Sequence, residues 1–182
     1  MDLARYNKAL HLAVIKHDGQ FYTSRKEIPF IAHPLYVAEV IKEYGFDDDV
    51  VIAAMLHDIV EDTDVTIEDI ESDFGERVGK LVDILTVDQK LNWQDRQPKT
   101  WDKMRTALPE AKAIKAADML HHFILKKEDL DLGRRIEDLL GHTAEETKWK
   151  YENLLKALAN GWSHPLLDET KKVYEEVKDS YL

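Results

Sequence analysis

Residues 50–63, VVIAAMLHDIVEDT, decide how this chain folds. Residues 50–56 are all apolar, which predicts a helix that is buried on every side. The stretch then adds four ionisable side chains, those of His57, Asp58, Glu61 and Asp62. A buried carboxylate without a partner is costly or becomes protonated, so these groups need something to satisfy them. A bound cation would do so.

Helical spacing continues outward from this stretch through nearly the whole chain. Only 7 Gly and 5 Pro interrupt 182 residues, and apolar residues recur at intervals of three and four. We expect helices over residues 3–16, 35–44, 50–63, 67–74, 76–85, 100–107, 110–123, 132–140, 144–158 and from 165 to the C-terminus. Residues 18–32 and 86–98 are expected to be loops. No segment has a convincing strand pattern, so the predicted fold class is all-α, a single-domain helical bundle.

The residue composition of the chain changes near residue 126. Residues 1–126 hold the apolar helices and all candidate site residues, and we expect them to form the core that carries the site. Residues 127–182 are richer in charge and amphipathic. We expect these C-terminal helices to pack on the same domain, with pairing to a second copy, a homodimer, as the alternative.

Composition excludes several classes of protein. The net charge of −11 argues against binding to nucleic acid through phosphate contacts, although a small phosphorylated substrate could bind to a local basic rim with a metal. The absence of cysteine excludes disulfides and thiolate ligands, so a metal would be held by nitrogen and oxygen. No apolar run is long enough to cross a membrane, and the N-terminus lacks the order of a signal peptide, which together predict a cytoplasmic protein.

Four candidate metal ligands lie in three separate predicted helices or at their ends: His33, His57, Asp58 and Asp118. A single histidine in an apolar helix is more often a hydrogen-bonded core residue than a ligand. Two imidazoles and two carboxylates in buried helices are harder to explain in that way. Such a mixed set suits Mn, Fe, Co, Ni or Zn and leaves positions for water and substrate.

Two further acids follow the central pair at helical spacing. Glu61 comes four residues after His57, and Asp62 comes four after Asp58, so a continuous helix would direct each acid toward the same side as a ligand. These carboxylates could order or deprotonate a water molecule. The alternative is a solvated helix end, but the helix dipole disfavours acids at a C-terminus.

This set of residues resembles the metal-binding signature of the HD-domain phosphohydrolases. The finer pattern is similar to the hydrolase domain of the RelA/SpoT homologues, including their small single-domain alarmone hydrolases. The resemblance covers residues 4 to about 124. Its segments are 17–20 (HDGQ), 30–34 (FIAHP), 56–63 (LHDIVEDT), 74–75 (FG) and 113–120 (AIKAADML).

The resemblance implies a manganese-dependent removal of the 3′-pyrophosphate from guanosine tetra- or pentaphosphate, with the four ligands holding the metal and Glu61 and Asp62 managing the water. An alarmone-synthetase domain does not fit in the chain, which predicts hydrolysis without synthesis. This sequence departs from the family pattern at two places, and both are places where the family contacts its substrate. The family's Arg-rich segment is replaced by residues 21–26 (FYTSRK), and its Asn four residues beyond the last metal ligand is His122 here.

The sequence also offers candidate contacts to substrate. We predict Arg25, Lys26, Lys115 and His122 as contacts to substrate, with Lys112 as a further cation, and each lysine or arginine could equally be a solvated charge. Alternatives to alarmone hydrolysis are a nucleoside monophosphate phosphatase of the wider HD superfamily and a module that binds a nucleotide without turning it over.

Overall fold

Helices form most of the chain in the computed structural model, which describes residues 2–23, 25–87, 90–133 and 143–181. Within these ranges the only β-type pairing is an isolated bridge between Phe21 and Pro29, so the predicted all-α fold is confirmed. The helices in chain order are α1 (Leu3–Lys16), α2 (Ala32–Glu43), α3 (Asp48–Met55), α4 (Ile59–Asp62), α5 (Ile67–Phe74), α6 (Glu76–Leu85), α7 (Trp93–Thr106), α8 (Pro109–Asp131), α10 (Ala144–Leu158), α11 (Pro165–Val177) and a 3₁₀ turn (Lys178–Tyr181).

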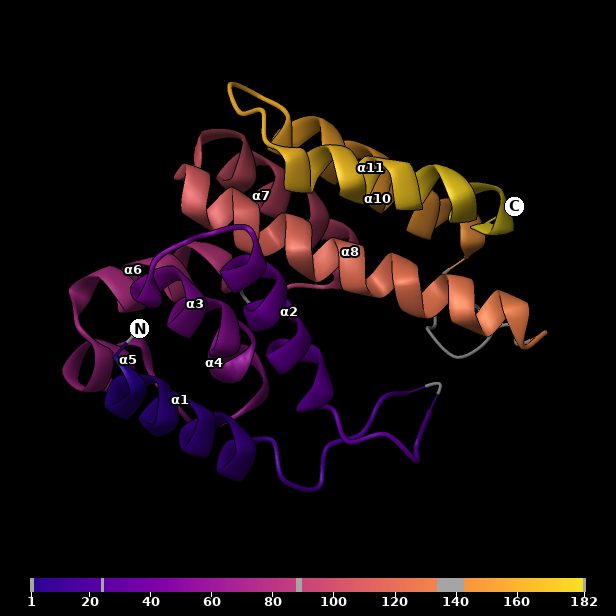
Figure 1. Cartoon of the computed structure of the whole chain (residues 1–182). Helices are drawn as coiled ribbons and strands as arrows, with labels where there is room; N and C mark the ends of the chain where they lie inside the picture. Colours follow the sequence, from indigo (N-terminus) through magenta and orange to yellow (C-terminus); the bar gives the residue numbers. More distant parts are fainter. Residues whose placement is uncertain (1, 24, 88–89, 134–142, 182) are drawn as a thin grey trace.

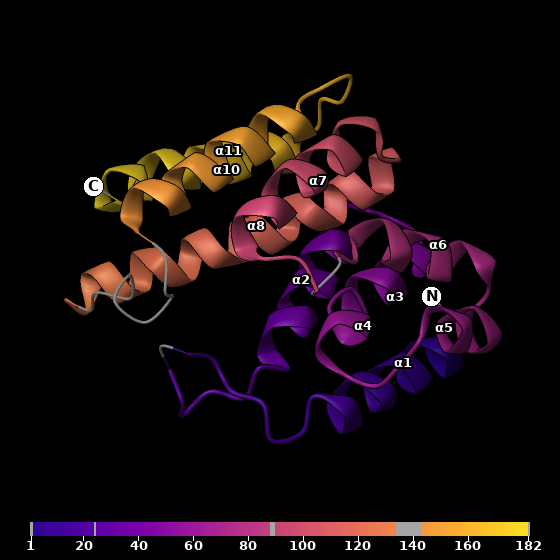
Figure 2. The same ribbon diagram turned by 180° about the vertical axis from the view of Figure 1, so that it is seen from behind.

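The long helix α8 lies between the two halves of the molecule. Helices α1 to α6 gather on one side of it and α10 and α11 on the other, as the two opposite views show (Figures 1 and 2). Helix α2 packs against both α3 and α8, while α11 packs along α8 and α10 packs along α7. The predicted division at residue 126 falls inside α8, so the two segments share this helix.

Helix α3 occupies the centre of the N-terminal half, as its sequence predicts. Each side chain from Val50 to Leu56 is at most 2% exposed. Asp47 begins the helix by accepting hydrogen bonds from the backbone N–H groups of Asp49 and Val50. Because close packing on every side leaves α3 little freedom to shift, it holds the start of the segment with His57 and Asp58 in a fixed position.

The predicted single helix over residues 50–63 is wrong, because the chain turns at residues 56–58. Helix α3 ends at Met55, and the four-residue helix α4 begins at Ile59. The Ala54 carbonyl, which would bond the Asp58 N–H in a continuous helix, accepts a hydrogen bond from the His57 side chain at 2.8 Å. Glu61 therefore lies in the first turn of α4, where the helix dipole favours a carboxylate, and the argument from an acidic C-terminus does not apply.

Three other boundaries differ from expectation. Helix α7 begins at Trp93, within the predicted loop, because Asn92 caps it by accepting from the Asp95 N–H at 2.9 Å. Helix α2 begins at Ala32, which places Pro34 in its first turn. Helix α8 continues to Asp131 rather than ending near 123. The predicted helix over residues 132–140 lies almost entirely outside the described residues.

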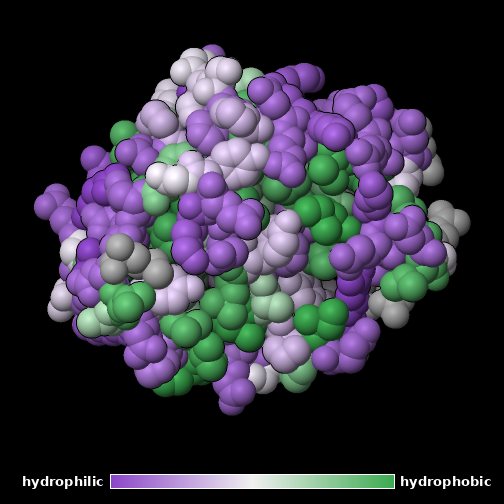
Figure 3. Space-filling view, in the orientation of Figure 1, coloured by the Kyte–Doolittle hydropathy of each residue, from purple (hydrophilic) through white to green (hydrophobic). Residues whose placement is uncertain are grey.

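The sequence of residues 66–69 (TIED) resembles a capping box, with Asp69 where Glu or Gln is usual, and the structure confirms it at the start of α5. Thr66 accepts from the Asp69 N–H at 3.2 Å, and the Asp69 carboxylate accepts from the Thr66 N–H at 3.0 Å. Gly75 then separates α5 from α6 with φ of 96°, a conformation that other residues adopt at a cost. Polar residues cover most of the face in Figure 3, with apolar areas between them. In the described part of the chain, no helix is both long and apolar enough to cross a membrane.

Candidate metal centre and its cavity

His57 presents one ring nitrogen to the site because its other ring nitrogen is used by the backbone. A carbonyl can only accept, so His57 Nδ1 carries the proton and donates to the Ala54 oxygen. Nε2 is therefore the nitrogen that faces the site, where it is buried beside the Asp58 carboxylate. Burial lowers the pKa of His57, but the Asp58 carboxylate outweighs burial and raises the pKa to about 9, so a cation that binds Nε2 takes the place of its proton. A buried imidazole nitrogen with a free lone pair is suited to bind a cation.

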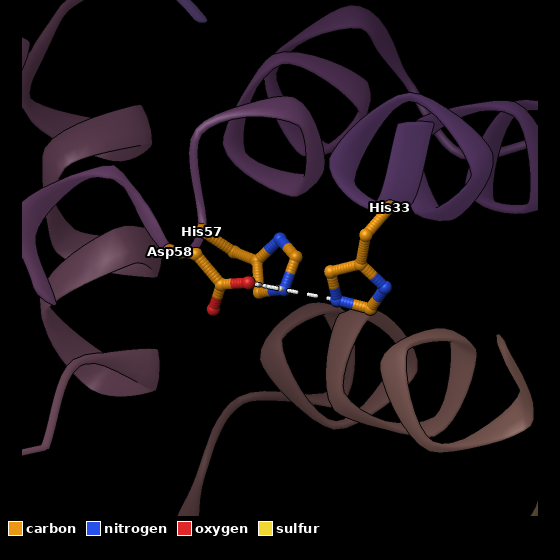
Figure 4. Close-up of side chains that lie close together, drawn as sticks. All are labelled: His33, His57 and Asp58. Atoms are coloured by element: carbon orange, nitrogen blue, oxygen red, sulfur yellow. Dashed lines mark ion pairs between the residues drawn. The ribbon is translucent and has the colours of Figure 1, made fainter. Parts of the chain in front are cut away.

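His33 brings the carboxylates of two distant segments together. Its Nε2 atom lies 3.5 Å from Asp58 Oδ2 and 3.3 Å from Asp118 Oδ1. Asp58 Oδ2 is also 3.2 Å from His57 Nε2. Figure 4 shows His33, from α2, and the 57–58 turn directing their side chains toward one another. These contacts link all four predicted metal ligands, with His33 Nε2 between the two carboxylates.

His121 holds the His33 ring in this orientation. The two Nδ1 atoms are 2.7 Å apart, and the rings stack with centroids 5.0 Å apart and an interplanar angle of 8°. Burial, with the neighbouring His33 and His122, lowers the pKa of His121 to about 3, so its ring is neutral near pH 7. Neutral His121 can accept the His33 Nδ1 proton, which leaves the lone pair of His33 on Nε2.

Asp118 is fixed from both sides. Lys115, one turn earlier on α8, donates to Asp118 Oδ2 at 2.7 Å. The other oxygen, Oδ1, faces His33 and lies 3.0 Å from His122 Nε2. Burial raises the pKa of Asp118, but the charge of Lys115 and the contacts of His122 and His33 outweigh it and hold the pKa well below its usual value.

The separations within this cluster fit a divalent cation. Neighbouring ligands about 2.1 Å from one metal lie about 3.0 Å apart in octahedral and about 3.4 Å apart in tetrahedral geometry. The ligand atoms of His33, His57 and Asp58 all lie within 4.8 Å of one another, as do those of His33, Asp118 and His122. Together with the unbonded Nε2 of His57, this donor set is that of a nitrogen–oxygen metal site.

A cavity of about 220 Å³ opens beside the cluster. Asp58, Asp118 and His122 line it at the ligand end, together with Glu61. Glu61 Oε1 accepts from the backbone N–H of Val87 at 2.8 Å, and burial raises the pKa of the Glu61 carboxyl. A base whose pKa is raised toward neutrality is suited to proton transfer.

The cavity is also lined by cations and aromatic rings from the C-terminal half. Arg96 on α7, Lys115 on α8 and Lys150 on α10 contribute positive charge, and Trp93 and Tyr151 contribute rings. Burial and the charge of Lys115 lower the pKa of Lys150 to about 8. The charged groups that act on Lys150 from neighbouring elements are Lys115, Asp118, Arg96 and Glu61. Three cations thus line one cavity in a protein whose net charge is negative, and such a local excess of positive charge suits an anion.

Other predicted residues lie elsewhere. Asp62 is exposed and is not among the residues that line the cavity. Arg25 is buried and binds the C-terminal end of α8, donating to Asp129 Oδ1 at 3.0 Å and to Glu128 Oε2 at 2.6 Å. Lys26 is exposed on the same loop.

Lys112 binds backbone oxygens rather than the cavity. Its ammonium group donates to the carbonyls of Asn160 at 2.6 Å and Arg105 at 3.3 Å. Of the four cations singled out in the sequence, only Lys115 lines the cavity.

Sequence reasoning missed Arg96, Lys150 and Tyr151. All three are on helices that reach the site only through packing, α7 and α10. No local pattern distinguishes them from solvated charges or core aromatics on an amphipathic helix. Only their position beside α8 reveals them.

Comparison with known proteins agrees with this site. The family described as HD domain matches residues 9–138, which is more than half of the chain. The chain therefore belongs to the HD-domain family.

Within that family, the chain is similar to proteins named for alarmone metabolism. It is 33% identical to the guanosine-3′,5′-bis(diphosphate) 3′-pyrophosphohydrolase of Aquifex aeolicus, with 95% of this chain and 26% of that protein covered. It is 37% identical to the mouse enzyme of the same name, with 66% and 69% covered. The chain thus spans about a quarter of the first of these relatives and about two thirds of the second.

A solved structure of a metazoan SpoT orthologue, described as hydrolysing ppGpp, superposes with a TM-score of 0.80. The two sequences are 27% identical, and 95% of each chain is covered. The arrangement of helices is therefore shared over nearly the whole of both chains.

Proposed function

We propose that this chain is a metal-dependent phosphohydrolase that removes the 3′-pyrophosphate of guanosine 3′,5′-bis(diphosphate), or of a related nucleotide. The observation that carries the proposal is the convergence on His33 Nε2 of Asp58 and Asp118, at 3.5 and 3.3 Å, beside a cavity lined by both carboxylates and cations. We call the three cations that line it the basic side of the cavity: Arg96, Lys115 and Lys150. The similarity to pyrophosphohydrolases named for this substrate supports it.

In this proposal His33, His57, Asp58 and Asp118 hold the cation. When bound, a divalent cation lowers the pKa of a water molecule and neutralises charge that develops on a phosphate. Manganese is the metal that the family resemblance favours, and Fe, Co, Ni and Zn also suit the donor set. The buried position of His57 and Asp118 limits competing water around the ligands.

Glu61 is placed to accept the proton of the attacking water. The Val87 N–H fixes one of its oxygens, and its raised pKa makes it a stronger base than an exposed carboxylate. The water oxygen bonds to the phosphorus next to the 3′-oxygen, the bond from that phosphorus to the 3′-oxygen breaks, and the 3′-oxygen takes up a proton. The products are pyrophosphate and a nucleotide with a free 3′-hydroxyl. Asp62, the second predicted acid, would assist from the more exposed side.

The basic side of the cavity would bind the phosphates that do not react. Arg96, Lys115 and Lys150 lie along it, and Trp93 or Tyr151 could stack on a base. His122, Arg25 and Lys26 stay predicted substrate contacts, although the donors of Arg25 are occupied by Glu128, Asp129 and the Leu125 carbonyl in this structure.

The test is to incubate the purified protein and an Asp58→Asn variant with ppGpp and Mn²⁺ and to measure the products. We expect the wild type to release pyrophosphate and the variant to lose most activity. Release of orthophosphate from nucleoside monophosphates, with none from ppGpp, would favour the monophosphate phosphatase. Tight nucleotide binding by calorimetry without turnover, with every metal tried, would favour a binding module.

A further inference from the structure

His122 lies beside the cluster of predicted ligands and is the one further residue that the geometry adds to it. It follows Asp118 by one turn of α8 and lines the cavity. We infer that His122 is a fifth protein ligand of the cation, and that the site binds through three imidazoles and two carboxylates. This inference rests on the proposed metal site, concerns its ligand number and metal preference, and replaces the substrate contact predicted for His122.

The distances support coordination. His122 Nε2 is 3.0 Å from Asp118 Oδ1, and that oxygen is 3.3 Å from His33 Nε2. Both separations match neighbouring ligands around one metal with bonds of about 2.1 Å. The His122 and His33 rings are also adjacent, with centroids 4.9 Å apart.

The two sets of ligand atoms have one residue in common. His33 belongs to both sets, one with His57 and Asp58 and the other with Asp118 and His122. Its Nδ1 is engaged by His121 at 2.7 Å, so only Nε2 is available to a metal. One imidazole nitrogen has one lone pair and binds one cation. Two separate ions cannot both use His33, and in this inference both sets close around the one ion that His33 binds.

Asp118 is oriented in a way that suits this arrangement. Lys115 binds Oδ2 at 2.7 Å, which leaves Oδ1 as the oxygen directed at His33 and His122. A simple ion pair between His122 and Asp118 would account for one of these contacts. It does not require the His122 ring to lie beside His33, whose Nε2 faces the same Asp118 oxygen.

A fifth ligand has consequences for the metal and for the reaction. An imidazole in place of a weaker donor raises the affinity for Co²⁺, Ni²⁺ and Zn²⁺ more than that for Mn²⁺. Five protein ligands leave one position of an octahedral cation for water or substrate. The substrate would then be positioned mainly by the basic side of the cavity, Arg96, Lys115 and Lys150.

The experiment compares the wild type with His122→Asn in binding Co²⁺. The matched control is His11→Asn, the same change at an exposed histidine on α1, away from the cavity. Co²⁺ affinity is measured by calorimetry, and ligand number by NMR of the Co²⁺-loaded protein. Each bound imidazole keeps one N–H, which the paramagnetic ion shifts far downfield. We expect three such signals in the wild type and the control, and two in the variant.

We also expect the Co²⁺ dissociation constant of His122→Asn to rise by at least about tenfold, since losing even an indirect partner of a metal ligand costs about 10- to 100-fold. His122→Phe, which keeps a ring against His33, should behave in the same way, and circular dichroism checks that both variants fold. Equal affinities and equal signal counts in wild type and variants would overturn the inference and leave the proposed function standing. Failure of the wild type to bind Co²⁺, Mn²⁺ or Zn²⁺ would overturn both.

Discussion

Replacing His121 by phenylalanine tests how the metal ligand His33 is oriented. His121 contacts His33 through the two Nδ1 atoms at 2.7 Å, and it stacks on Tyr36 with centroids 4.2 Å apart and an interplanar angle of 13°. Phenylalanine keeps the stacking ring and removes the acceptor. The substitution therefore separates the hydrogen bond from the packing.

The expected magnitude follows from the two forms of a neutral imidazole. In the wild type, the proton on His33 Nδ1 has an acceptor, and Nε2 is free for the cation. In His121→Phe, that N–H would be buried without a partner, at a cost of about 1–3 kcal/mol. The proton then moves to Nε2 and must leave before a metal binds. Lost partners of metal-binding histidines cost about 10- to 100-fold in affinity, or about 1.4–2.7 kcal/mol, which is the same range.

Calorimetric titration with Mn²⁺ or Zn²⁺ measures this effect. We expect the dissociation constant of His121→Phe to rise by about 10- to 100-fold. The control His11→Phe, at an exposed position, should leave the constant unchanged. An unchanged dissociation constant in a folded His121→Phe protein would show that His121 does not set the tautomer of His33.

Three further predictions concern the cavity and the scaffold. Glu61→Gln keeps an oxygen that accepts from the Val87 N–H but cannot take up a proton. We therefore expect kcat to fall by about 10²- to 10⁴-fold, while the metal affinity measured by calorimetry is retained. A near-normal kcat would show that Glu61 does not transfer the proton. Lys150 has a pKa of about 8 and is charged below that pH, so kcat/KM should fall as the pH rises through about 8. Lys150→Gln should lower kcat/KM below pH 8 and abolish that alkaline fall, and a fall that persists in the variant would assign it to another group. Thr66→Ala removes the acceptor for the Asp69 N–H and should lower the free energy of unfolding, measured in urea, by about 1 kcal/mol. Thr66→Ser keeps a hydroxyl acceptor and should retain the wild-type stability. Equal stability of Thr66→Ala and the wild type would show that the cap does not stabilise the protein.

Local chemistry made several elements predictable. The capping box at Thr66 and Asp69 depends on residues three apart, and its hydrogen bonds form as the sequence indicates. The burial of Val50 to Leu56 follows from an apolar run that has no polar side. In both cases the decisive contacts are near in sequence or follow from residue type alone.

Side-chain partners that helical periodicity does not encode explain where the structure departs from the predicted helices. The predicted continuous helix from 50 to 63 fails at His57, whose side chain takes a backbone carbonyl and turns Nε2 toward His33. Arg25, which stays a predicted substrate contact, binds Asp129, 104 residues away, on an extension of α8 that the sequence pattern did not predict. Helical periodicity carries no information about such partners.

The sequence by itself determined the all-α fold and the residues that can bind a metal. Four ionisable groups placed in apolar helices must be compensated, and their types limit what can compensate them. Only the tertiary structure decided how these groups are used: the turn at His57, the support of His33 by His121, the position of His122 beside Asp118, and the cations of α7 and α10 on the far side of the cavity. The physical reason is that orientation, tautomer and local charge depend on which side chains meet across the packed helices.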